Sequence, residues 1–238
     1  MIELPTEKST PSKKLSDYTM LIYGEPKVGK TTFASEFPNA LFLLTTPAPE
    51  ALPIYKIPIL SWRDFIDALL ELRKGDHDFD TVVVDTTDVL FDYCREHVTK
   101  KLGIDHPSDL DFGKGWEALR NEFQKNLARL CSLPTGTLFI SHSDLKEIET
   151  HVGTRSKYVP TLTGQARKVV NKLTSFILYF RIAHTEDEGE VREVRTRPGT
   201  LWEAGIRTEK NAQLPDPLPM NYDLFVEAFK DSFGKEND

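Results

Sequence analysis

The chain has 238 residues, of which 39% are hydrophobic, and no apolar run approaches the roughly 18 residues that a membrane-spanning helix needs. We therefore expect one folded domain without membrane contact, and we expect it in the cytoplasm, because the N-terminus lacks the apolar core of a signal peptide and the two cysteines give no disulfide framework. The net charge of −7 excludes a protein that coats nucleic acid through its overall electrostatic field.

Strand-like and helix-like segments alternate up to residue 141. Residues 1–17 are polar and aperiodic, so we expect a disordered tail there, a single folded domain at residues 18–233 and a flexible C-terminus at residues 234–238. Apolar runs predict strands at residues 18–23, 40–44, 81–85 and 137–141. Amphipathic stretches predict helices that begin near residues 30, 61, 89 and 116. This alternation predicts an α/β fold, with a mostly parallel sheet and helices on both faces.

The pattern changes after residue 141. A polar, basic segment at residues 144–163 precedes a basic helix. Two strand-like runs then flank an acidic turn at residues 186–190, and together they predict a C-terminal β-hairpin. Residues 198–219 are rich in Pro and Gly, and apolar spacing at residues 222–233 predicts a final helix.

A glycine-rich segment at residues 24–32, GEPKVGKTT, matches the P-loop pattern and lies between a predicted strand and a predicted helix. Gly24 and Gly29 permit the tight turn that points backbone N–H groups at phosphates, next to the favourable end of a helix. Lys30 would reach the β- and γ-phosphates, and the Thr31 hydroxyl would bind Mg²⁺. The predicted nucleotide-binding residues are Gly24, Glu25, Pro26, Lys27, Val28, Gly29, Lys30, Thr31 and Thr32.

The base of the nucleotide is a separate question. A GTPase carries an Asn-Lys-x-Asp element after a late strand, whereas the nearest string here, at residues 171–174, lacks the aspartate and lies in a helix pattern. ATP, with Mg²⁺, is therefore the favoured nucleotide.

Polar residues end two further predicted strands. Asp85 follows a buried strand, where ligands bind in open α/β sheets, and it would complete the Mg²⁺ site as a Walker B carboxylate. A plain helix N-cap is the alternative for Asp85. Ser141 or His142, at the end of a later strand, would sense the γ-phosphate, and a satisfied strand-end histidine is the alternative for His142.

The order of these motifs is specific. A P-loop, a strand that ends at Asp85, the run DFGKGW, a strand that ends FISHSD, and the strings PTLTGQARKVVNKLTS and EAGIRTEKNAQLP resemble the RecA-like ATPases of bacteriophages. These are AAA-type ATP-binding proteins grouped with RecA-like single-strand annealing and recombination proteins. The resemblance spans residues 18–229, and it implies a RecA-like core whose sensor strand lies between the P-loop strand and the Walker B strand.

The resemblance also implies a ring or filament with ATP between neighbouring copies. Arg207 matches the late basic residue that such assemblies project into a neighbour's site as a finger, and Lys210 is the alternative. RecA-like ATPases usually place a glutamate at the end of the second strand to polarise the attacking water, whereas Thr45 and Thr46 stand there in this chain. Glu50 is then the candidate catalytic base, with a helix-starting acid as its alternative, so we expect slow turnover.

In RecA-like proteins, the loop after the sensor strand faces the DNA. Basic residues with an interleaved aromatic suit a single strand, because cations follow the phosphates and an aromatic ring stacks on bases. The predicted DNA-binding residues are Lys146, Arg155, Lys157, Tyr158, Arg167 and Lys168, with His151 and Lys172 beside them. The alternative is a solvated polar hairpin, since Glu147 and Glu149 dilute the positive charge.

These observations predict an ATPase that acts on single-stranded DNA in phage recombination or repair, by annealing or strand exchange, in the host cytoplasm. The expected partners are single-stranded DNA, further copies of the chain and a single-strand-binding protein. Three alternatives stay open: a nucleotide-gated DNA-binding or loading module with little turnover, a DnaB-like helicase motor, and a small-molecule kinase, which an Arg-rich lid would have favoured.

Overall fold

The computed structural model describes residues 4–7, 12–47, 49–150, 153–185, 189–208 and 213–233. The predicted C-terminal segment at residues 234–238 lies outside these ranges, as do His151 and Lys210. No helix in the described ranges is both long enough and apolar enough to cross a membrane.

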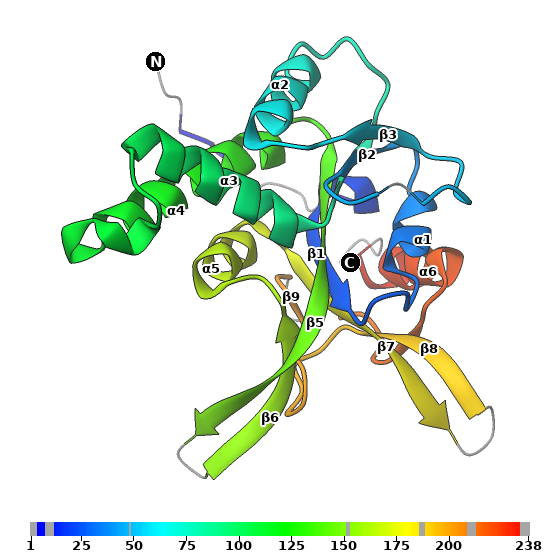
Figure 1. Ribbon diagram of the computed structural model, residues 1–238. Helices are drawn as coiled ribbons and strands as arrows, with labels where there is room; N and C mark the ends of the chain where they lie inside the picture. Colours follow the sequence, from blue (N-terminus) through cyan, green and yellow to red (C-terminus); the bar gives the residue numbers. More distant parts are fainter. Residues whose placement is uncertain are drawn as a thin grey trace.

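Strands within the described residues form one sheet in the order β10-β8-β7-β1-β5-β4-β2-β3, with β6 paired to β5 and β9 paired to β7 (Figure 1). The strands are β1 (Thr19–Gly24), β2 (Ala40–Leu44), β3 (Tyr55–Pro58), β4 (Thr81–Asp85), β5 (Gly136–Thr150), β6 (Gly153–Pro160), β7 (Phe176–Thr185), β8 (Gly189–Arg195), β9 (Gly205–Ile206) and β10 (Leu218–Pro219). Strands β3, β2, β4, β5, β1 and β7 run parallel, so their carboxyl ends share one edge of the sheet. The predicted sensor strand, β5, lies between β1 and β4, as the resemblance implies.

Helices cover both faces of this sheet, which confirms the predicted fold class. The helices are α1 (Lys30–Ser35), α2 (Trp62–Leu72), α3 (Thr87–Leu102), α4 (Lys114–Cys131), α5 (Gly164–Leu173) and α6 (Tyr222–Phe233), with 3-10 turns at Leu15–Asp17, Pro107–Asp109 and Asp111–Gly113. Apolar residues of α2, α3, α4 and α5 pack on one face, and those of α1 and α6 pack on the other. The two cores meet opposite sides of β1, because alternate strand residues point to opposite faces.

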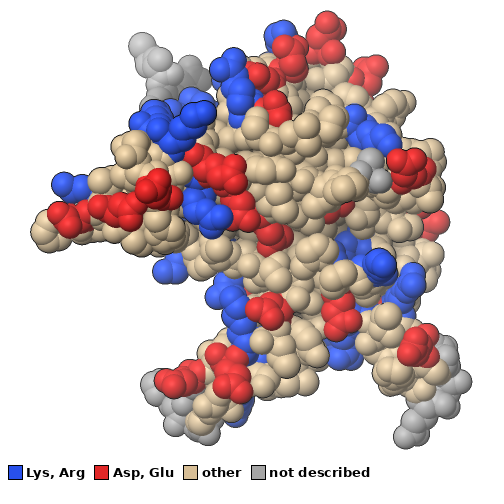
Figure 2. All heavy atoms as spheres, viewed as in Figure 1, with Lys and Arg blue, Asp and Glu red and all other residues tan. Residues whose placement is uncertain are grey.

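Two antiparallel arms extend from the carboxyl edge of the sheet, one built by β5 and β6 and the other by β7 and β8 (Figures 1 and 2). The β7–β8 pair confirms the predicted C-terminal hairpin. The β5–β6 pair shows that the polar segment after residue 141 is not a loop, because β5 continues to Thr150 and its partner strand begins at Gly153.

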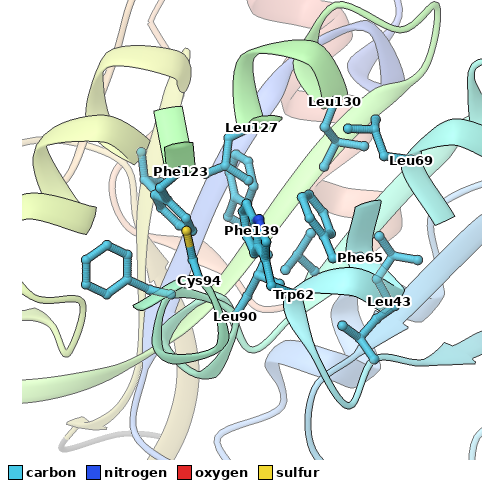
Figure 3. Packing of buried hydrophobic residues seen from close by; sticks show 14 of the residues in the cluster. Leu43, Trp62, Phe65, Leu69, Leu90, Cys94, Phe123, Leu127, Leu130 and Phe139 are labelled. Atoms are coloured by element: carbon cyan, nitrogen blue, oxygen red, sulfur yellow. The ribbon is translucent and has the colours of Figure 1, made fainter. Parts of the chain in front are cut away.

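The larger core shows why α2 and α4 form where they do. Trp62, Phe65 and Phe123 lie in one cluster with Phe139, near the start of β5, and all four side chains are almost fully buried (Figure 3). At the first turn of α2, the Ser61 hydroxyl accepts a hydrogen bond from the backbone N–H of Asp64, which is the N-cap expected from the sequence.

Two boundaries differ from the sequence expectations. Leu15, placed in the predicted tail, is 6% exposed and packs in the core with α1 and α6, so the folded domain begins before Tyr18. Strand β3 was not predicted. Its residues are exposed and it ends at Pro58, which suits an edge strand that needs few inward-facing apolar residues.

Candidate functional site

The two glycines of the P-loop are required by backbone geometry. Gly24 ends β1, and a Cβ added there would lie 2.2 Å from the carbonyl oxygen of Phe180 on β7. Gly29 has a φ of +116°, in the left-handed region that side-chain-bearing residues rarely adopt. The loop between them, with Glu25, Pro26 and Lys27 exposed and Val28 buried, therefore turns from β1 into α1 as the motif predicts.

Lys30 points back into the loop that it follows. Its ammonium donates hydrogen bonds to the carbonyl oxygens of Gly24 and Glu25, both at 2.8 Å, and the residue is only 5% exposed. Burial lowers the pKa of Lys30 to about 8, although the carboxylates of Asp85 and Asp88 act in the opposite direction. A largely dehydrated ammonium in a loop of backbone N–H groups is suited to phosphate oxygens.

Thr31 and Asp85 meet as the sequence predicts. The Thr31 hydroxyl donates to Asp85 Oδ2 at 2.7 Å, and Asp85, at the end of β4, is 7% exposed. Burial raises the pKa of Asp85, and the Thr31 hydrogen bond and the Lys30 charge oppose that rise. A hydroxyl and a carboxylate are hard oxygen donors of the kind that Mg²⁺ takes together with phosphate oxygens, so these residues fit the predicted metal.

Asp88 is a functional candidate that the sequence analysis missed. Its Oδ1 accepts hydrogen bonds from Ser141 Oγ at 3.0 Å and from Thr161 Oγ1 at 2.5 Å. Its other oxygen, Oδ2, is buried and has no partner among the described residues, and burial raises the pKa of the carboxyl. The available signal was its position, because Asp88 lies in the first turn of α3, three residues after the Walker B carboxylate Asp85 that ends β4.

Of the two candidate phosphate sensors, His142 is the one with a free hydrogen-bonding atom among the described residues. The hydroxyl of Ser141 already donates to Asp88, whereas His142 Nδ1 is buried without a partner in the described ranges. Burial and the nearby Lys30 charge lower the pKa of His142, while Asp88 and Asp85 oppose the shift. The ring is therefore mainly neutral at pH 7.

The end of β2 has a structural role in place of the missing glutamate. Thr45 is buried, and its hydroxyl donates to the carbonyl of Thr86 at 2.9 Å and accepts from the N–H of Thr86 at 2.8 Å. These bonds tie β2 to the segment after Asp85. Glu50 lies in an exposed turn beyond β2, and no described contact of its side chain reaches the P-loop, so its predicted role as base would require that turn to move.

Arg207 is engaged within its own chain. Its guanidinium donates to the carbonyl oxygens of Lys172 and Asn171, at 3.0 and 2.9 Å, and both carbonyls lie in the last turn of α5. A cation at a helix C-terminus satisfies carbonyls that have no partner within the helix and interacts favourably with the helix dipole. The predicted finger role would require Arg207 to leave α5, and the alternative, Lys210, lies outside the described residues.

The β5–β6 arm separates its charges by face. Residues directly opposite each other in an antiparallel pair share a face, and Lys146 pairs with Lys157 while Ile148 pairs with Arg155. Glu147 and Glu149 alternate with these residues and therefore lie on the other face. The basic face of the arm, defined by Lys146, Arg155 and Lys157, is thus separated from Glu147 and Glu149. Asp144, which pairs with Val159 at the base of the arm, is the one described acid of these strands on the same face.

The remaining predicted DNA contacts lie elsewhere. Tyr158 shares the opposite face of the arm, and its ring stacks on Tyr179 with centroids 5.6 Å apart, so it is a packing residue and not a free stacking surface. Arg167 is half-buried, with one guanidinium nitrogen enclosed and unpartnered among the described residues, whereas Lys168 on α5 is exposed. Of these three residues, Lys168 is the exposed one.

Comparisons with known proteins give one family. A family model described as an AAA domain, AAA_24, matches residues 16–208. A solved structure of a KaiC-like protein from the hyperthermophilic archaeon Pyrococcus horikoshii is similar at 12% identity and a TM-score of 0.45, over 76% of this chain and 78% of that chain. No curated protein matches the sequence. The matched range contains the P-loop, Asp85, His142 and both arms.

Proposed function

This chain belongs to the AAA_24 family of AAA domains, and on that premise we propose that it binds ATP with Mg²⁺ and uses the bound nucleotide to control contact with single-stranded DNA. The observation that carries the proposal is that β5 joins both candidate sites. The strand carries His142 at the nucleotide edge, and four residues later it carries Lys146 on the basic face.

Hydrogen bonds at the base of the arm supply a physical connection. Asp88 binds a hydroxyl from each strand, Ser141 on β5 and Thr161 just after β6, and the Thr161 N–H also donates to the carbonyl of His142 at 2.9 Å. Asp88 itself lies at the start of α3, immediately after the Walker B segment. A shift of His142 or Asp85 toward a γ-phosphate would therefore act on both strands of the arm.

The basic face supports an anionic strand as the partner. Lys146 and Lys157 stand directly opposite each other, an arrangement that destabilises a sheet by like-charge repulsion. Neither lysine has an ion-pair partner among the described residues. A phosphate backbone would remove the repulsion by placing negative charge between them. Because the rest of the chain is acidic overall, we expect binding to be local and strongly dependent on salt.

Hydrolysis is proposed to be slow. Lys30, Thr31 and Asp85 supply phosphate and metal contacts, and Mg²⁺ would neutralise charge on the transferred phosphate. Thr45 occupies the place of the expected water-polarising glutamate, and its hydroxyl is committed to Thr86. That observation favours a second candidate function, in which the protein is a nucleotide-gated DNA-binding or loading module with little turnover.

The biological setting rests on the sequence resemblance. Annealing or strand exchange in phage recombination or repair, by a ring or filament of this chain, is the process that we propose. It is supported by the basic arm at the nucleotide edge.

The direct test is an ATPase assay with and without single-stranded DNA, run beside Lys30→Ala. DNA-stimulated turnover that is lost in Lys30→Ala supports the ATPase proposal, and ATP binding without turnover supports the gated module. Stimulation by a small phosphate acceptor and not by DNA would contradict both and favour a kinase.

A companion test addresses the arm. We expect the triple variant Lys146→Ser, Arg155→Ser, Lys157→Ser to lose single-stranded DNA affinity and to show a weaker salt dependence, because each lost phosphate contact removes about one unit from the slope. The matched control is Lys100→Ser, Lys101→Ser, Lys125→Ser, which removes three exposed cations from α3 and α4. Equal DNA affinity in the two triple variants would place the DNA site elsewhere.

A further inference from the structure

We propose that a pocket between α1, β8 and the turn at residues 220–223 holds the base of the nucleotide, and that this base is an aminopurine. The proposal rests on the proposed nucleotide site and adds a base-recognition subsite to it. The wall formed by residues 220–223 lies beyond the range matched by the AAA-domain family, residues 16–208, whereas the walls from α1 and β8 lie within it.

The sheet order sets the direction of the bound triphosphate. The groups that suit the γ-phosphate and metal, Asp85 and His142, lie on β4 and β5, on one side of the P-loop strand β1. Strands β7 and β8 lie on the other side of β1. A triphosphate held by Lys30 with its γ end toward β4 must therefore direct its nucleoside end toward β8 and α6.

A cavity lies on that side. Its volume is about 250 Å³, and it shares Gly29 and Thr32 with the phosphate loop. This is slightly below the roughly 300–1,000 Å³ of sites that enclose whole drug-sized ligands, so the cavity is suited to one part of a nucleotide. Its remaining walls come from α1, from β8 and from the turn that begins α6.

Met220 provides an apolar surface beside the phosphate loop. Its sulfur lies 3.2 Å from the position that a Cβ on Gly29 would take, so the thioether contacts the P-loop itself. The backbone N–H of Met220 donates to the carbonyl of Arg192 at 3.0 Å, which fixes the turn against β8. Thioether sulfur packs favourably on aromatic rings, and a purine ring offers such a surface.

The wall behind Met220 is rigid and aromatic. The ring of Tyr222 packs against Phe37 and Phe33, with centroid distances of 4.9 and 5.9 Å. Burial raises the pKa of Tyr222 to about 12, so its hydroxyl stays protonated at neutral pH. The cavity therefore combines a flat apolar wall with a polar rim.

The charged groups on the rim determine the ligand class. Glu36 and Asp223 supply carboxylate oxygens, which only accept hydrogen bonds at neutral pH, and Arg192 is exposed with no partner among the described residues. Carboxylates select ring or exocyclic N–H groups, such as those of adenine or guanine. The Arg192 guanidinium, 3.8 Å from the position of a Cβ on Gly29, is placed to meet the phosphate end of the same ligand.

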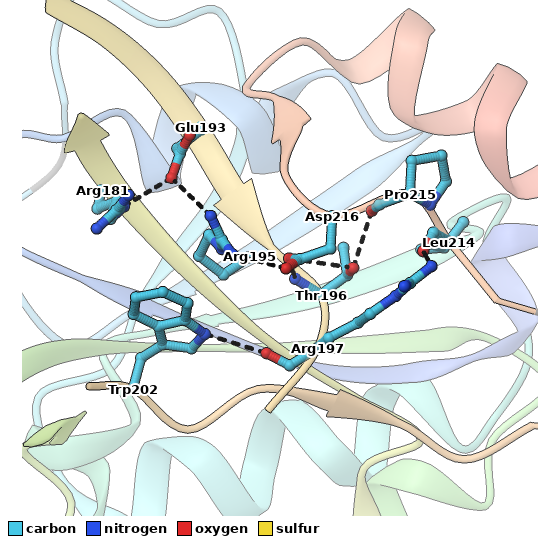
Figure 4. A network of polar contacts seen from close by, with 9 residues as sticks. All are labelled: Arg181, Glu193, Arg195, Thr196, Arg197, Trp202, Leu214, Pro215 and Asp216. Carbon is cyan, nitrogen blue, oxygen red and sulfur yellow. Dashed lines mark hydrogen bonds and ion pairs between the residues drawn. The ribbon is translucent and has the colours of Figure 1, made fainter. Parts of the chain in front are cut away.

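A polar network holds the segment that carries this turn (Figure 4). Arg195 on β8 donates to the carboxylate of Asp216 at 2.7 Å, and the N–H of Thr196 donates to the same carboxylate at 2.8 Å. Arg197 donates to the carbonyl of Leu214 at 3.0 Å. These bonds fix residues 214–216 against β8, four residues before Met220, so the pocket wall is positioned before any ligand arrives.

The test compares ligands that differ only at the nucleoside end. Calorimetric titration with ATP, GTP and inorganic tripolyphosphate is carried out on the full chain and on Met220→Ala, with the exposed α6 substitution Leu224→Ala as the matched control. We expect Met220→Ala to lower the affinity for ATP or GTP by about tenfold and to leave the affinity for tripolyphosphate unchanged. Leu224→Ala should bind all three ligands as the parent does. Met220→Trp, which fills the cavity, should cause a larger loss for the same ligands.

The outcomes distinguish a failure of the base pocket from a failure of the proposed nucleotide site. The base pocket is wrong, and the phosphate site is unaffected, in either of two cases. In the first, Met220→Ala and Met220→Trp bind ATP and GTP as tightly as the parent does. In the second, these variants lose as much affinity for tripolyphosphate as for the nucleotides. If the parent binds neither nucleotide nor tripolyphosphate, or if Lys30→Ala binds as tightly as the parent, the nucleotide site itself is wrong. A preference for ATP over GTP identifies adenine as the base, and the reverse identifies guanine.

Discussion

The P-loop edge and the β5–β6 arm show two ways of placing charge. At the P-loop edge, Lys30 and Asp85 are buried and Thr31 is half-buried, and each has a hydrogen-bond partner within the protein. On the arm, Lys146 is exposed and Lys157 is half-buried; the two face each other and have no ion-pair partner among the described residues. The first arrangement is complete as a folded structure, whereas the second carries a repulsion that a bound anion would relieve. We therefore expect the nucleotide site to be preformed, whereas the proposed DNA surface would be stabilised by its ligand.

The largest expected effect is at the P-loop edge. Lys30→Ala should lower the affinity for ATP by about 100-fold or more, because the variant removes the buried cation that would bind the phosphates. Calorimetric titration measures the loss. Lys56→Ala, at an exposed lysine of β3 outside the P-loop, is the control and should change the affinity by less than about threefold. Equal losses in the two variants would show that burial does not distinguish these lysines.

Asp85→Asn tests the metal site within the same edge. The amide keeps the shape of the side chain but loses the charge that Mg²⁺ requires, so we expect nucleotide binding to become insensitive to Mg²⁺ and any ATPase rate to fall by about 100-fold. A Mg²⁺ titration followed by nucleotide affinity and phosphate release measures both effects. A normal Mg²⁺ response in Asp85→Asn would remove Asp85 from the metal site.

The connection between the two regions is tested at Asp88. Asp88→Ala leaves the hydroxyls of Ser141 and Thr161 without their acceptor, and we expect the free energy of unfolding to fall by about 1–3 kcal/mol. DNA affinity should also stop responding to ATP. Urea denaturation and fluorescence anisotropy measure the two effects. Asp92→Ala, in an exposed ion pair on the same helix, should change stability by less than about 0.5 kcal/mol and keep the ATP response.

The smallest expected effect is on the arm. Lys157→Glu places opposite charges across from each other, so we expect a gain of about 0.2–1 kcal/mol in unfolding free energy together with weaker DNA binding. Thermal denaturation and DNA titration, run on the same preparation, measure these opposed changes. Glu147→Lys adds positive charge on the other face and should leave DNA affinity nearly unchanged. A lysine there that strengthened binding as much as Lys157→Glu weakened it would show that both faces contact DNA.

The sequence predicts a region well when the residues that define it are neighbours along the chain. The P-loop and its glycines are defined by nine consecutive residues, and Asp85 is defined by the strand that it ends, so both were predictable. The role of Asp88 depends on Thr161, which is 73 residues away along the chain. The capture of Arg207 by the end of α5 likewise joins residues 35 and 36 positions apart. Such contacts depend on the folded topology and leave no local pattern.

The β5–β6 arm was predictable only in part. Its basic composition was visible in the sequence, but the separation of cations from acids depends on the pairing register of β5 with β6. A shift of one residue would exchange the two faces. The register also places Tyr158 against Tyr179, which is why composition alone suggested a stacking residue and the structure gives a packing residue.

The central claim is that the nucleotide site controls the DNA surface, and the affinity for a fluorescent single-stranded oligonucleotide with and without Mg²⁺–ATP tests it most directly. We expect ATP to strengthen binding by about tenfold in the parent chain, a coupling of about 1.4 kcal/mol, and to have no effect in Lys30→Ala. Equal affinities with and without ATP in the parent chain, measured at ATP concentrations that saturate the site, would contradict the claim.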